Sequence, residues 1–213
     1  MNRQLPFSQA CENNKQFILD ILKKHLRRSG VGTALHCVLE IAGGTGQHAV
    51  FFAGHFSDLQ WQCSDIPAHV DSLNLRLRAA GLPNLPPAIP LDVNQAQWDC
   101  PETNVVYSAN SLHIMSAGSV ENFFAGVGNQ LREGGLLLVY GPFKYGGAFT
   151  TESNARFDLW LKDRDSVSGI RDFEWINGLA QSVNLELVED NAMPANNQLL
   201  VWKRISANRA PTN

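Results

Sequence analysis

The chain has 213 residues, of which 44% are hydrophobic and 17% are charged, and this composition excludes disordered and fibrous proteins. Its formal net charge of -3 argues against a general electrostatic grip on nucleic acid or on an anionic membrane. No apolar stretch approaches the roughly 18 residues of a spanning helix, and the first residues lack the apolar core of a secretory signal. We therefore expect a cytoplasmic protein with no membrane partner.

Hydrophobic periodicity, with glycine and proline as breakers, predicts the elements in chain order. The first half is predicted to hold helices over 8–28, 47–56 and 67–80, and strands over 34–41, 59–64, 88–91 and 104–109. The second half is predicted to hold helices over 119–131, 150–162 and 172–183, and strands over 136–140, 185–190 and 199–203.

Strands that alternate with helices predict βαβ units and a mainly parallel sheet, with ligands over the carboxyl ends of the strands. The last two predicted strands have no helix between them, which indicates an antiparallel hairpin at one edge. We expect an α/β fold of the doubly wound type, formed by a single domain over 1–204 that begins with a helix. A disordered tail is expected over 205–213.

The four cysteines indicate reduced thiols. No CxxC pair occurs among them, so neither a zinc ribbon nor a thioredoxin-like motif is supported, and no metal site is expected. Cys37 and Cys63 stand in apolar runs and are predicted to lie in the core.

A glycine-rich segment follows the first predicted strand directly and contains Gly43, Gly44 and Gly46. Glycine lets a ligand approach the main chain with no Cβ in its way, and the following helix start offers free N–H groups. The alternative is that the glycines only allow a tight strand-to-helix turn and bind no ligand. The acidic residues that follow favour a ligand-binding loop.

Acidic residues recur near the ends of the first three predicted strands. Glu40 can brace the glycine loop or meet a charged ligand group. Asp65 can accept hydrogen bonds from both hydroxyls of a ribose, or it can cap the helix that follows. Asp92 can meet the exocyclic amine of adenine, or it can be a solvated loop residue. Together they favour a cofactor that contains a nucleoside.

Two cofactors fit this spacing. Residues 44–49 satisfy the G-x-G-x-x-G/A pattern of dinucleotide-binding folds, and Asp65 suits an NAD ribose equally well. Glu40, however, places a negative charge where a pyrophosphate would lie, and the closing hairpin departs from two repeated mononucleotide-binding halves. S-adenosylmethionine carries a sulfonium and an ammonium in place of phosphates, so carboxylates near the loop suit it better.

Three segments resemble the nucleoside-binding motifs of class I S-adenosylmethionine-dependent methyltransferases, namely 39–48, 64–65 and 91–93. The order of elements is also similar to that superfamily. More narrowly, the chain resembles a small methyltransferase-like family of unknown function found in bacteria and animals, from about Asn13 to Arg204. The segments that carry the narrower resemblance are Asn14-Lys15, Tyr140-Gly141-Pro142-Phe143, Ser153-Asn154, Phe157-Asp158, Arg171-Asp172 and Met193-Pro194-Ala195-Asn196-Asn197.

The resemblance implies a Rossmann-like class I methyltransferase fold, with a mainly parallel seven-stranded sheet, a C-terminal antiparallel hairpin and helices on both faces. It implies S-adenosylmethionine as the cofactor. The cofactor-binding residues that it implies are Glu40, Ala42, Gly43, Gly44, Gly46, Asp65, Asp92, Val93 and Asn110. Ala42 stands where the superfamily commonly has its first glycine, and alanine is tolerated there if its φ is negative.

The acceptor side is predicted from two segments. His113 is a candidate general base because its unperturbed pKa lies near neutrality, although a single histidine beside an apolar run is more often structural. Asn154 and Asp158 lie in or beside a loop whose glycines would let it move over a small pocket; a purely structural loop is the alternative. The absence of basic runs favours a small-molecule acceptor over nucleic acid.

The sequence therefore predicts a methyltransferase that acts on an unknown small-molecule acceptor. One alternative is a protein that binds S-adenosylmethionine or its demethylated product without catalysis, and another is an NAD-dependent oxidoreductase. A nucleic-acid methyltransferase is disfavoured, because no Asn-Pro-Pro-aromatic tetrapeptide follows the predicted strand at 104–109. The oligomeric state is left open.

Overall fold

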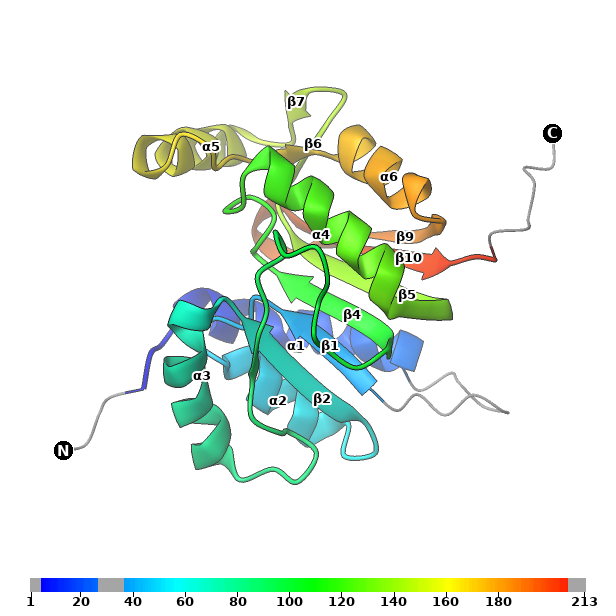
Figure 1. The fold of residues 1–213 in the computed structure, drawn as a ribbon. Helices are drawn as coiled ribbons and strands as arrows, with labels where there is room; N and C mark the ends of the chain where they lie inside the picture. The colour runs from blue at the N-terminus through cyan, green and yellow to red at the C-terminus, as the bar shows by residue number, and fades with distance from the viewer. Residues whose placement is uncertain (1–4, 27–36, 207–213) are drawn as a thin grey trace. The chain divides into compact units, whose positions relative to one another are not determined.

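A computed structural model describes residues 5–26 and 37–206, and its chain forms two compact units (Figure 1). Unit 1 comprises Met1–Asp92 and Asp99–Tyr107, and unit 2 comprises Val93–Trp98 and Ser108–Asn213. The single domain expected over 1–204 stays a prediction. Of the tail expected over 205–213, residues 207–213 lie outside the described part.

Unit 1 follows the predicted order of elements. It contains α1 (Gln9–Leu26), β1 (Cys37–Ile41), α2 (Gln47–His55), β2 (Gln60–Asp65), α3 (Pro67–Ala80), β3 (Ile89–Pro90) and most of β4 (Thr103–Ala109). β1 and β2 pair in parallel with Glu40 opposite Cys63, and β2 and β3 pair in parallel with Ser64 opposite Ile89. Parallel pairing brings the carboxyl ends of these strands to one edge, where the glycine loop begins.

Unit 2 holds the remaining helices and strands. These are α4 (Ala117–Gln130), β5 (Leu131–Gly141), β6 (Phe143–Tyr145), β7 (Ala148–Phe149), α5 (Glu152–Arg164), β8 (Arg171–Asp172), α6 (Phe173–Ser182), β9 (Leu185–Met193), the 3-10 turn η1 (Pro194–Asn196) and β10 (Asn197–Arg204). The four long helices and strands expected after residue 140 are all present, with bounds that differ by a few residues.

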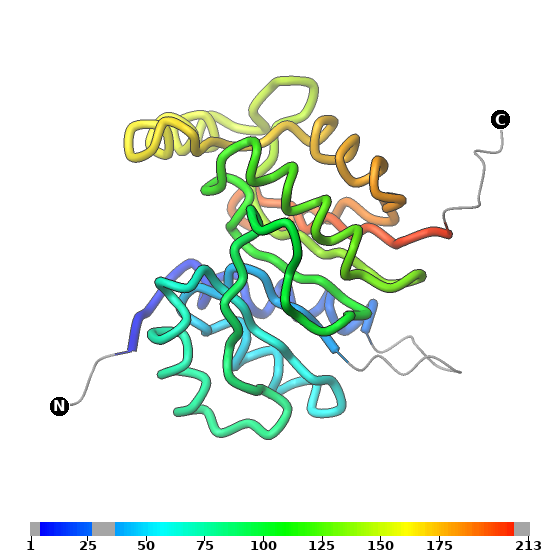
Figure 2. Tube along the Cα trace, viewed as in Figure 1, coloured from blue at the N-terminus to red at the C-terminus, as the bar shows by residue number. Residues whose placement is uncertain are grey.

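The main sheet has seven strands in the order β3-β2-β1-β4-β5-β10-β9. β10 runs antiparallel to both β5 and β9, which confirms the hairpin predicted at one edge. Figure 2 follows β10, at the red end of the chain, beside β5 and β9. The α/β fold with a mostly parallel seven-stranded sheet is therefore as predicted.

A second, three-stranded sheet in the order β7-β6-β8 was not predicted. Gly146 and Gly147 form the two-residue turn between β6 and β7, with φ of +57° and +77°. A tight hairpin turn of this kind needs positive φ at both positions, which glycine adopts without strain. The prediction of a loop over this segment was wrong. The helix predicted from Asp172 is present as α6 and begins one residue later, because Asp172 belongs to β8.

Aromatic rings fill the apolar core of each unit. In unit 1 the ring of Phe52 lies 5.4 Å from that of Trp61 and 5.6 Å from that of Tyr107, between centroids. In unit 2 the ring of Phe124 lies 6.1 Å from that of Trp202. Within residues 5–26 and 37–206, no helix has the length and apolar character that crossing a membrane requires.

Candidate functional site

The glycine loop of unit 1 joins the end of β1 to the start of α2. A Cβ at Gly43 would lie 2.2 Å from the Sγ of Cys63, so only glycine fits at this point. A Cβ at Gly44 would meet no atom within 4 Å, and this exposed residue has a φ of +56°. The loop is thus packed against β2 at Gly43 and open at Gly44, as a loop that a ligand approaches must be.

The backbone conformation of Ala42 contradicts the expectation of a negative φ. Its φ is +60°, so the condition under which alanine was expected to replace the superfamily's first glycine does not hold. The backbone keeps the left-handed conformation that suits glycine, and an alanine in this conformation costs about 1–2 kcal/mol. The strain is held at the point where β1 turns into the glycine loop.

Asp65 ends β2 and reaches the glycine loop. Its buried carboxylate accepts hydrogen bonds from the N–H of Gly44 at 2.7 Å and from the N–H of Ile66 at 2.8 Å. The Nδ1 of His69 lies 3.0 Å from the same carboxylate. The carboxylate therefore joins the end of β2 to the glycine loop, a contact that was not predicted, and its contact with a ribose stays a prediction.

Glu40 lies in β1 with its side chain fully enclosed. Its Oε2 accepts a hydrogen bond from the indole N–H of Trp61 at 2.6 Å. Burial raises the pKa of Glu40 to about 7, against the effect of that hydrogen bond, and the negative charge of Asp65 adds to the rise. Glu40 thus links β1 to Trp61 of β2, and both of its predicted roles, bracing the glycine loop and meeting a charged ligand group, stay predictions.

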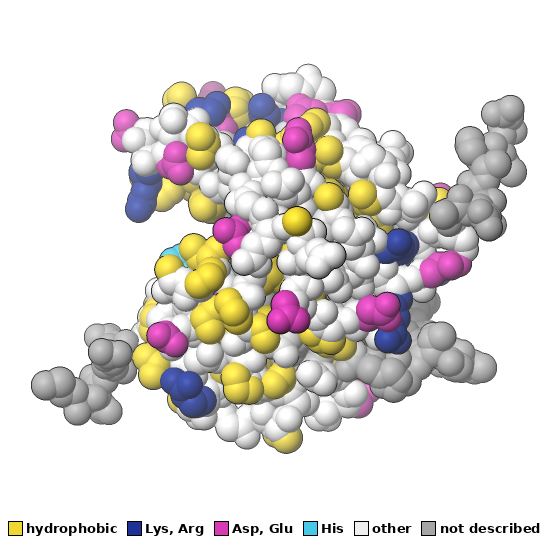
Figure 3. Space-filling view, viewed as in Figure 1, with side chains coloured by type: hydrophobic (Ala, Val, Ile, Leu, Met, Phe, Trp, Pro, Cys, Tyr) yellow, Lys and Arg dark blue, Asp and Glu magenta, His cyan; other side chains and the backbone are white. Residues whose placement is uncertain are grey.

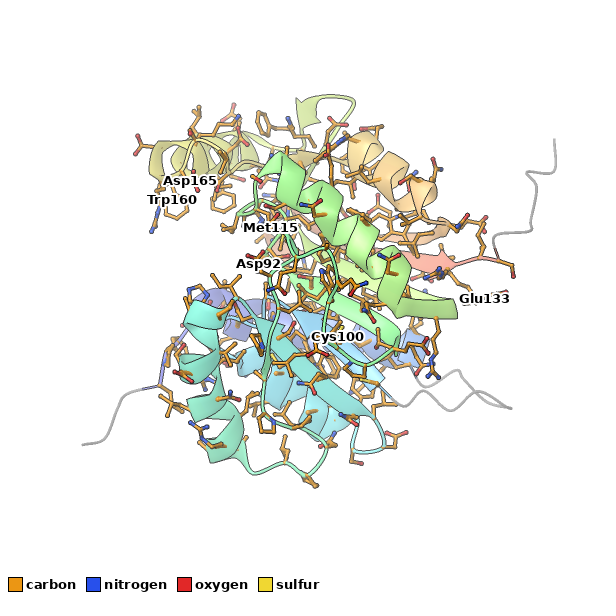
Figure 4. The ribbon with its side chains drawn as sticks, in the orientation of Figure 1. Asp92, Cys100, Met115, Glu133, Trp160 and Asp165 are labelled. Carbon is orange, nitrogen blue, oxygen red and sulfur yellow. The ribbon has the colours of Figure 1, made fainter. Side chains whose placement is uncertain are left out.

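The other predicted cofactor residues lie in both units. Asp92 belongs to unit 1 and is half-buried, and the neighbouring N–H of Leu91 donates to the carbonyl of Asp65 at 2.8 Å (Figure 4). Val93 and Asn110 belong to unit 2. Val93 is buried, and Asn110 has a φ of +55°, which asparagine tolerates, while its N–H donates to the carbonyl of Tyr140.

Gln47, which sequence reasoning missed, connects the N-terminal segment to the glycine loop. Its Oε1 accepts hydrogen bonds from the N–H of Ser8 at 2.6 Å and from the hydroxyl of Thr45 at 3.0 Å. Its Nε2 donates to the carboxylate of Glu12 at 2.5 Å. These contacts hold α1 against the loop. A polar residue at the first position of a helix gave no signal that it would have this role.

His113 lies in unit 2, in the segment that follows β4. Its buried ring meets the ring of Phe157 edge-on, with centroids 5.4 Å apart, and its backbone carbonyl accepts from the N–H of Gly169. Burial, with a smaller contribution from the positive charge of Arg171, lowers the pKa of His113 to about 4. The imidazole is therefore neutral near pH 7. Its role as a general base stays a prediction.

Asn154 and Asp158 lie on α5, and contacts within unit 2 engage both side chains. The Nδ2 of Asn154 donates to the hydroxyl of Thr150 and to the carbonyl of Asn196, each at 2.9 Å. The carboxylate of Asp158 accepts from the N–H of Ile170 at 2.7 Å and from the Nζ of Lys162 at 2.6 Å. Their predicted catalytic roles are untested, but both residues also anchor α5.

The thiols agree with the sequence expectation. Cys37 and Cys63 are buried, and all four cysteines are free. Among residues 5–26 and 37–206, no group of three or more His, Cys, Asp or Glu side chains is arranged to hold a metal ion.

One family model, described as "Protein of unknown function (DUF938)", matches residues 5–204 of the chain. Among solved structures, an O-methyltransferase family protein from Burkholderia thailandensis has a TM-score of 0.77 and 19% identity, over 91% of this chain and 57% of that one. Human N-acetylserotonin methyltransferase, solved in complex with S-adenosylmethionine, has a TM-score of 0.67 and 13% identity, over 90% and 55%.

An O-methyltransferase family 2 protein from Planctomyces limnophilus, in complex with apigenin, has a TM-score of 0.76 and 16% identity, over 92% of this chain and 58% of that one. The chain thus spans little more than half the length of these three proteins. At such identities the likeness shows the fold alone. It confirms the predicted Rossmann-like class I methyltransferase fold.

Proposed function

Because the chain belongs to the family described as "Protein of unknown function (DUF938)" and has the class I methyltransferase fold, we propose that it is an S-adenosylmethionine-dependent methyltransferase. Its acceptor is a small molecule, since the net charge of -3 gives no general attraction to a nucleic acid. The free cysteines agree with a reducing compartment such as the cytoplasm.

One observation carries this proposal: the open backbone of Gly44 lies against the carboxylate of Asp65. The open space beside Gly44 lets a ligand approach the backbone, and the carboxylate is an acceptor for ribose hydroxyls. Ile66, which follows Asp65 and is 42% exposed, offers an apolar surface for a flat base. The residues present therefore fit an adenosine group.

The backbone N–H donors of the glycine loop are poorly suited to bind a dinucleotide. Dinucleotide sites hold a pyrophosphate on the free N–H groups of the glycine loop. Here the N–H of Gly43 donates to the carbonyl of Ser64, that of Gly44 to Asp65, and that of Gly46 to the carbonyl of Gly43. With these donors engaged and Glu40 beneath the loop, S-adenosylmethionine is favoured over NAD.

When bound, S-adenosylmethionine supplies a methyl group on a positively charged sulfur. In the proposal Asp65 holds the ribose, Asp92 lies at the adenine, and Glu40 braces the loop. The backbone of residues 42–46 would hold the methionine part. The cofactor roles predicted for Val93 and Asn110, which belong to unit 2, stay predictions. The contribution of the chain is binding and alignment, which is worth up to about 7–11 kcal/mol in favourable reactions.

Thermal unfolding tests the identity of the cofactor. A ligand that binds only the folded state at a hundredfold excess over its Kd adds about 2.7 kcal/mol to the free energy of unfolding. We expect S-adenosylmethionine and S-adenosylhomocysteine to raise the Tm and NAD to leave it unchanged. Stabilisation by NAD alone would overturn the proposal.

Substitution of Asp65 tests the site. Asp65→Ala is expected to weaken S-adenosylhomocysteine binding by about 1.5–3 kcal/mol, because charged hydrogen bonds to the ribose are lost. Titration calorimetry on the folded variant measures this change. Asp58→Ala, which removes an exposed carboxylate before β2, is the control and should bind normally. Equal affinity of the two variants would leave Asp65 as a loop brace alone.

Turnover separates an enzyme from a non-catalytic binder. The protein is incubated with S-adenosylmethionine and a small-molecule extract of cells, and S-adenosylhomocysteine is quantified. A methyltransferase forms S-adenosylhomocysteine only when the extract is present. A protein that is stabilised by the cofactor but forms none across extracts from several sources is a binder.

A further inference from the structure

The carboxylate of Asp65 in unit 1 is almost fully occupied by donors from the described residues. Its Oδ1 accepts from the N–H of Ile66 at 2.8 Å and from the Nδ1 of His69 at 3.0 Å. Its Oδ2 accepts from the N–H of Gly44 at 2.7 Å, and the side chain is only 6% exposed. A carboxylate offers about four acceptor positions, two on each oxygen, so these contacts leave one position on Oδ2.

A ribose brings two hydroxyl donors and therefore needs two acceptor positions on this carboxylate. One of the three donors already bound must leave before both hydroxyls can bind. The N–H groups of Gly44 and Ile66 belong to the backbone, and they move only if the glycine loop or the start of α3 is rearranged. His69 is the donor that holds Asp65 through a side chain.

The imidazole of His69 can leave without disturbing the helix. Its side chain is 59% exposed, whereas its backbone is fixed in the first turn of α3. There its N–H donates to the carbonyl of Ile66 at 2.9 Å, and its carbonyl accepts from the hydroxyl of Ser72 at 2.8 Å. Rotation of the side chain to another staggered rotamer carries the ring from Asp65 into water.

The surroundings of the carboxylate suit the rest of an adenosine. Apolar side chains lie on the surface of unit 1 around α3 (Figure 3), and Ile66, beside Asp65, is 42% exposed. The backbone of Gly44 is open on the other side of the contact. Departure of the imidazole therefore opens an acceptor that lies between an apolar side chain and an accessible backbone.

From these contacts we infer that His69 controls the access of the cofactor to Asp65. In the free protein the imidazole holds one acceptor position of the carboxylate, and a ribose hydroxyl takes that position by displacing it. His69 thereby lowers the affinity for the cofactor, because binding must break its contact with Asp65. The inference rests on the proposed function and adds to it a residue that controls cofactor binding.

Removal of the imidazole tests this competition. His69→Ala is expected to bind S-adenosylhomocysteine about 2–5-fold more tightly than the unsubstituted chain, because no exposed contact has to be broken. Titration calorimetry on the full chain measures the change. His55→Ala is the matched control, since His55 is also exposed on a helix of unit 1, but its Nδ1 lies 2.8 Å from the carbonyl of Phe51. Its affinity should equal that of the unsubstituted chain.

Two analogues of S-adenosylhomocysteine separate displacement from a general effect of the substitution. One lacks the 2′-hydroxyl of the ribose and the other lacks the 3′-hydroxyl. The analogue without the displacing hydroxyl leaves His69 in place, so it should bind the unsubstituted chain and His69→Ala equally. The affinity lost with that hydroxyl should therefore be about 2–5-fold smaller in the unsubstituted chain. A merely structural role of His69 would change the binding of all three ligands alike.

A structure of the complex with S-adenosylhomocysteine shows the displacement directly. We expect the Nδ1 of His69 to lie beyond hydrogen-bond distance, about 3.5 Å, from both oxygens of Asp65. A ribose hydroxyl should take its place on the carboxylate.

Three results would overturn the inference. They are unchanged or weaker binding of S-adenosylhomocysteine by His69→Ala, losses for both analogues that are equal in the two proteins, and a complex in which the Nδ1 of His69 stays on Asp65. Each of them leaves the proposed function standing, because S-adenosylhomocysteine still binds. If it binds neither the unsubstituted chain nor His69→Ala, the proposed function is refuted and the inference with it.

Discussion

At the scale of single residues, the left-handed backbone of Ala42 is strained for alanine, whereas glycine adopts it without strain. Ala42→Gly is expected to raise the free energy of unfolding by a few tenths to about 1 kcal/mol, because relief of the left-handed alanine exceeds the entropy that glycine gains in the unfolded chain. Urea denaturation measures the change. Ala79→Gly, at an exposed helical position in α3, should instead lower stability by about 0.5–1 kcal/mol.

The same two substitutions decide whether the backbone at residue 42 is strained. If both variants lose stability to a similar extent, the left-handed conformation of Ala42 carries no cost in the folded protein. If Ala42→Gly also changes the affinity for S-adenosylhomocysteine by no more than a few-fold, the strain is structural and does not tune the cofactor site.

Single residues also show where sequence reasoning reaches its limit. Asp65 and Gly44 could be predicted to lie close together, because both follow strands whose carboxyl ends share an edge, although the hydrogen bond between them was not predicted. The positive φ of Ala42 could not be predicted, since an alanine in the sequence gives no sign of a left-handed backbone.

At the scale of elements, α5 is held in place by Asn154. Asn154→Ala removes two hydrogen bonds, to Thr150 and to the carbonyl of Asn196, and is expected to lower the free energy of unfolding by about 1–3 kcal/mol. Arg156→Ala is the control on the same helix. It removes an exposed ion pair with Glu152 and should change stability by less than about 0.5 kcal/mol.

Turnover measured on the same two variants decides what else Asn154 does. Its predicted place on the acceptor side requires that S-adenosylhomocysteine affinity stays within a few-fold while turnover falls. A folded Asn154→Ala protein with full turnover and a lower midpoint of unfolding would make Asn154 an anchor of α5 and nothing more.

The long elements and the short strand β3 were predictable, whereas the three short strands β6, β7 and β8 were not. A proline in the first turn and a glycine after the end predict where helix α3 begins and ends, and both bounds were predicted correctly. β6, β7 and β8 have two or three residues each, too few for any alternation of apolar and polar side chains. They form only because two glycines close the hairpin and β8 pairs alongside β6.

At the scale of the whole molecule, three buried groups shape the dependence of stability on pH. The pKa of Glu40 is raised to about 7, so its contribution is present at low pH and is lost as pH rises through that value. Burial lowers the pKa values of His48 and His113 to about 4. Between about pH 4 and 6.5 the unfolded chain binds protons at these residues and the folded protein does not, so their contribution to the free energy of unfolding rises with pH. The two effects oppose each other up to about pH 7.5, because the two histidines of the unfolded chain are still half protonated at pH 6.5.

Between pH 6.5 and 8, the titration of Glu40 is expected to lower the free energy of unfolding by about 1 kcal/mol and that of the two histidines to raise it by a similar amount, so the unsubstituted protein should change little. Glu40→Gln, whose amide oxygen still accepts from Trp61, removes only the fall, so the free energy of unfolding of this variant should rise by about 1 kcal/mol over the interval. Urea denaturation at the two pH values measures it. Glu121→Gln, at an exposed site in α4, is the control and should behave as the unsubstituted protein does. A Glu40 variant whose free energy of unfolding changes no more than that of the unsubstituted protein would contradict the assignment.

The place of β10 in the sheet also constrains how the protein can be made. β10 lies between β5 and β9, yet it is the last of the three to leave the ribosome. Translation adds about 5–20 residues per second, so the edge of β5 that β10 will cover stays unpaired for several seconds. An unpaired apolar edge of this kind is a template for association with other chains. A premature stop codon or a proteolytic cut before Asn197 would leave that edge open permanently, so the truncated product is expected to aggregate or be degraded rather than persist as a shorter protein.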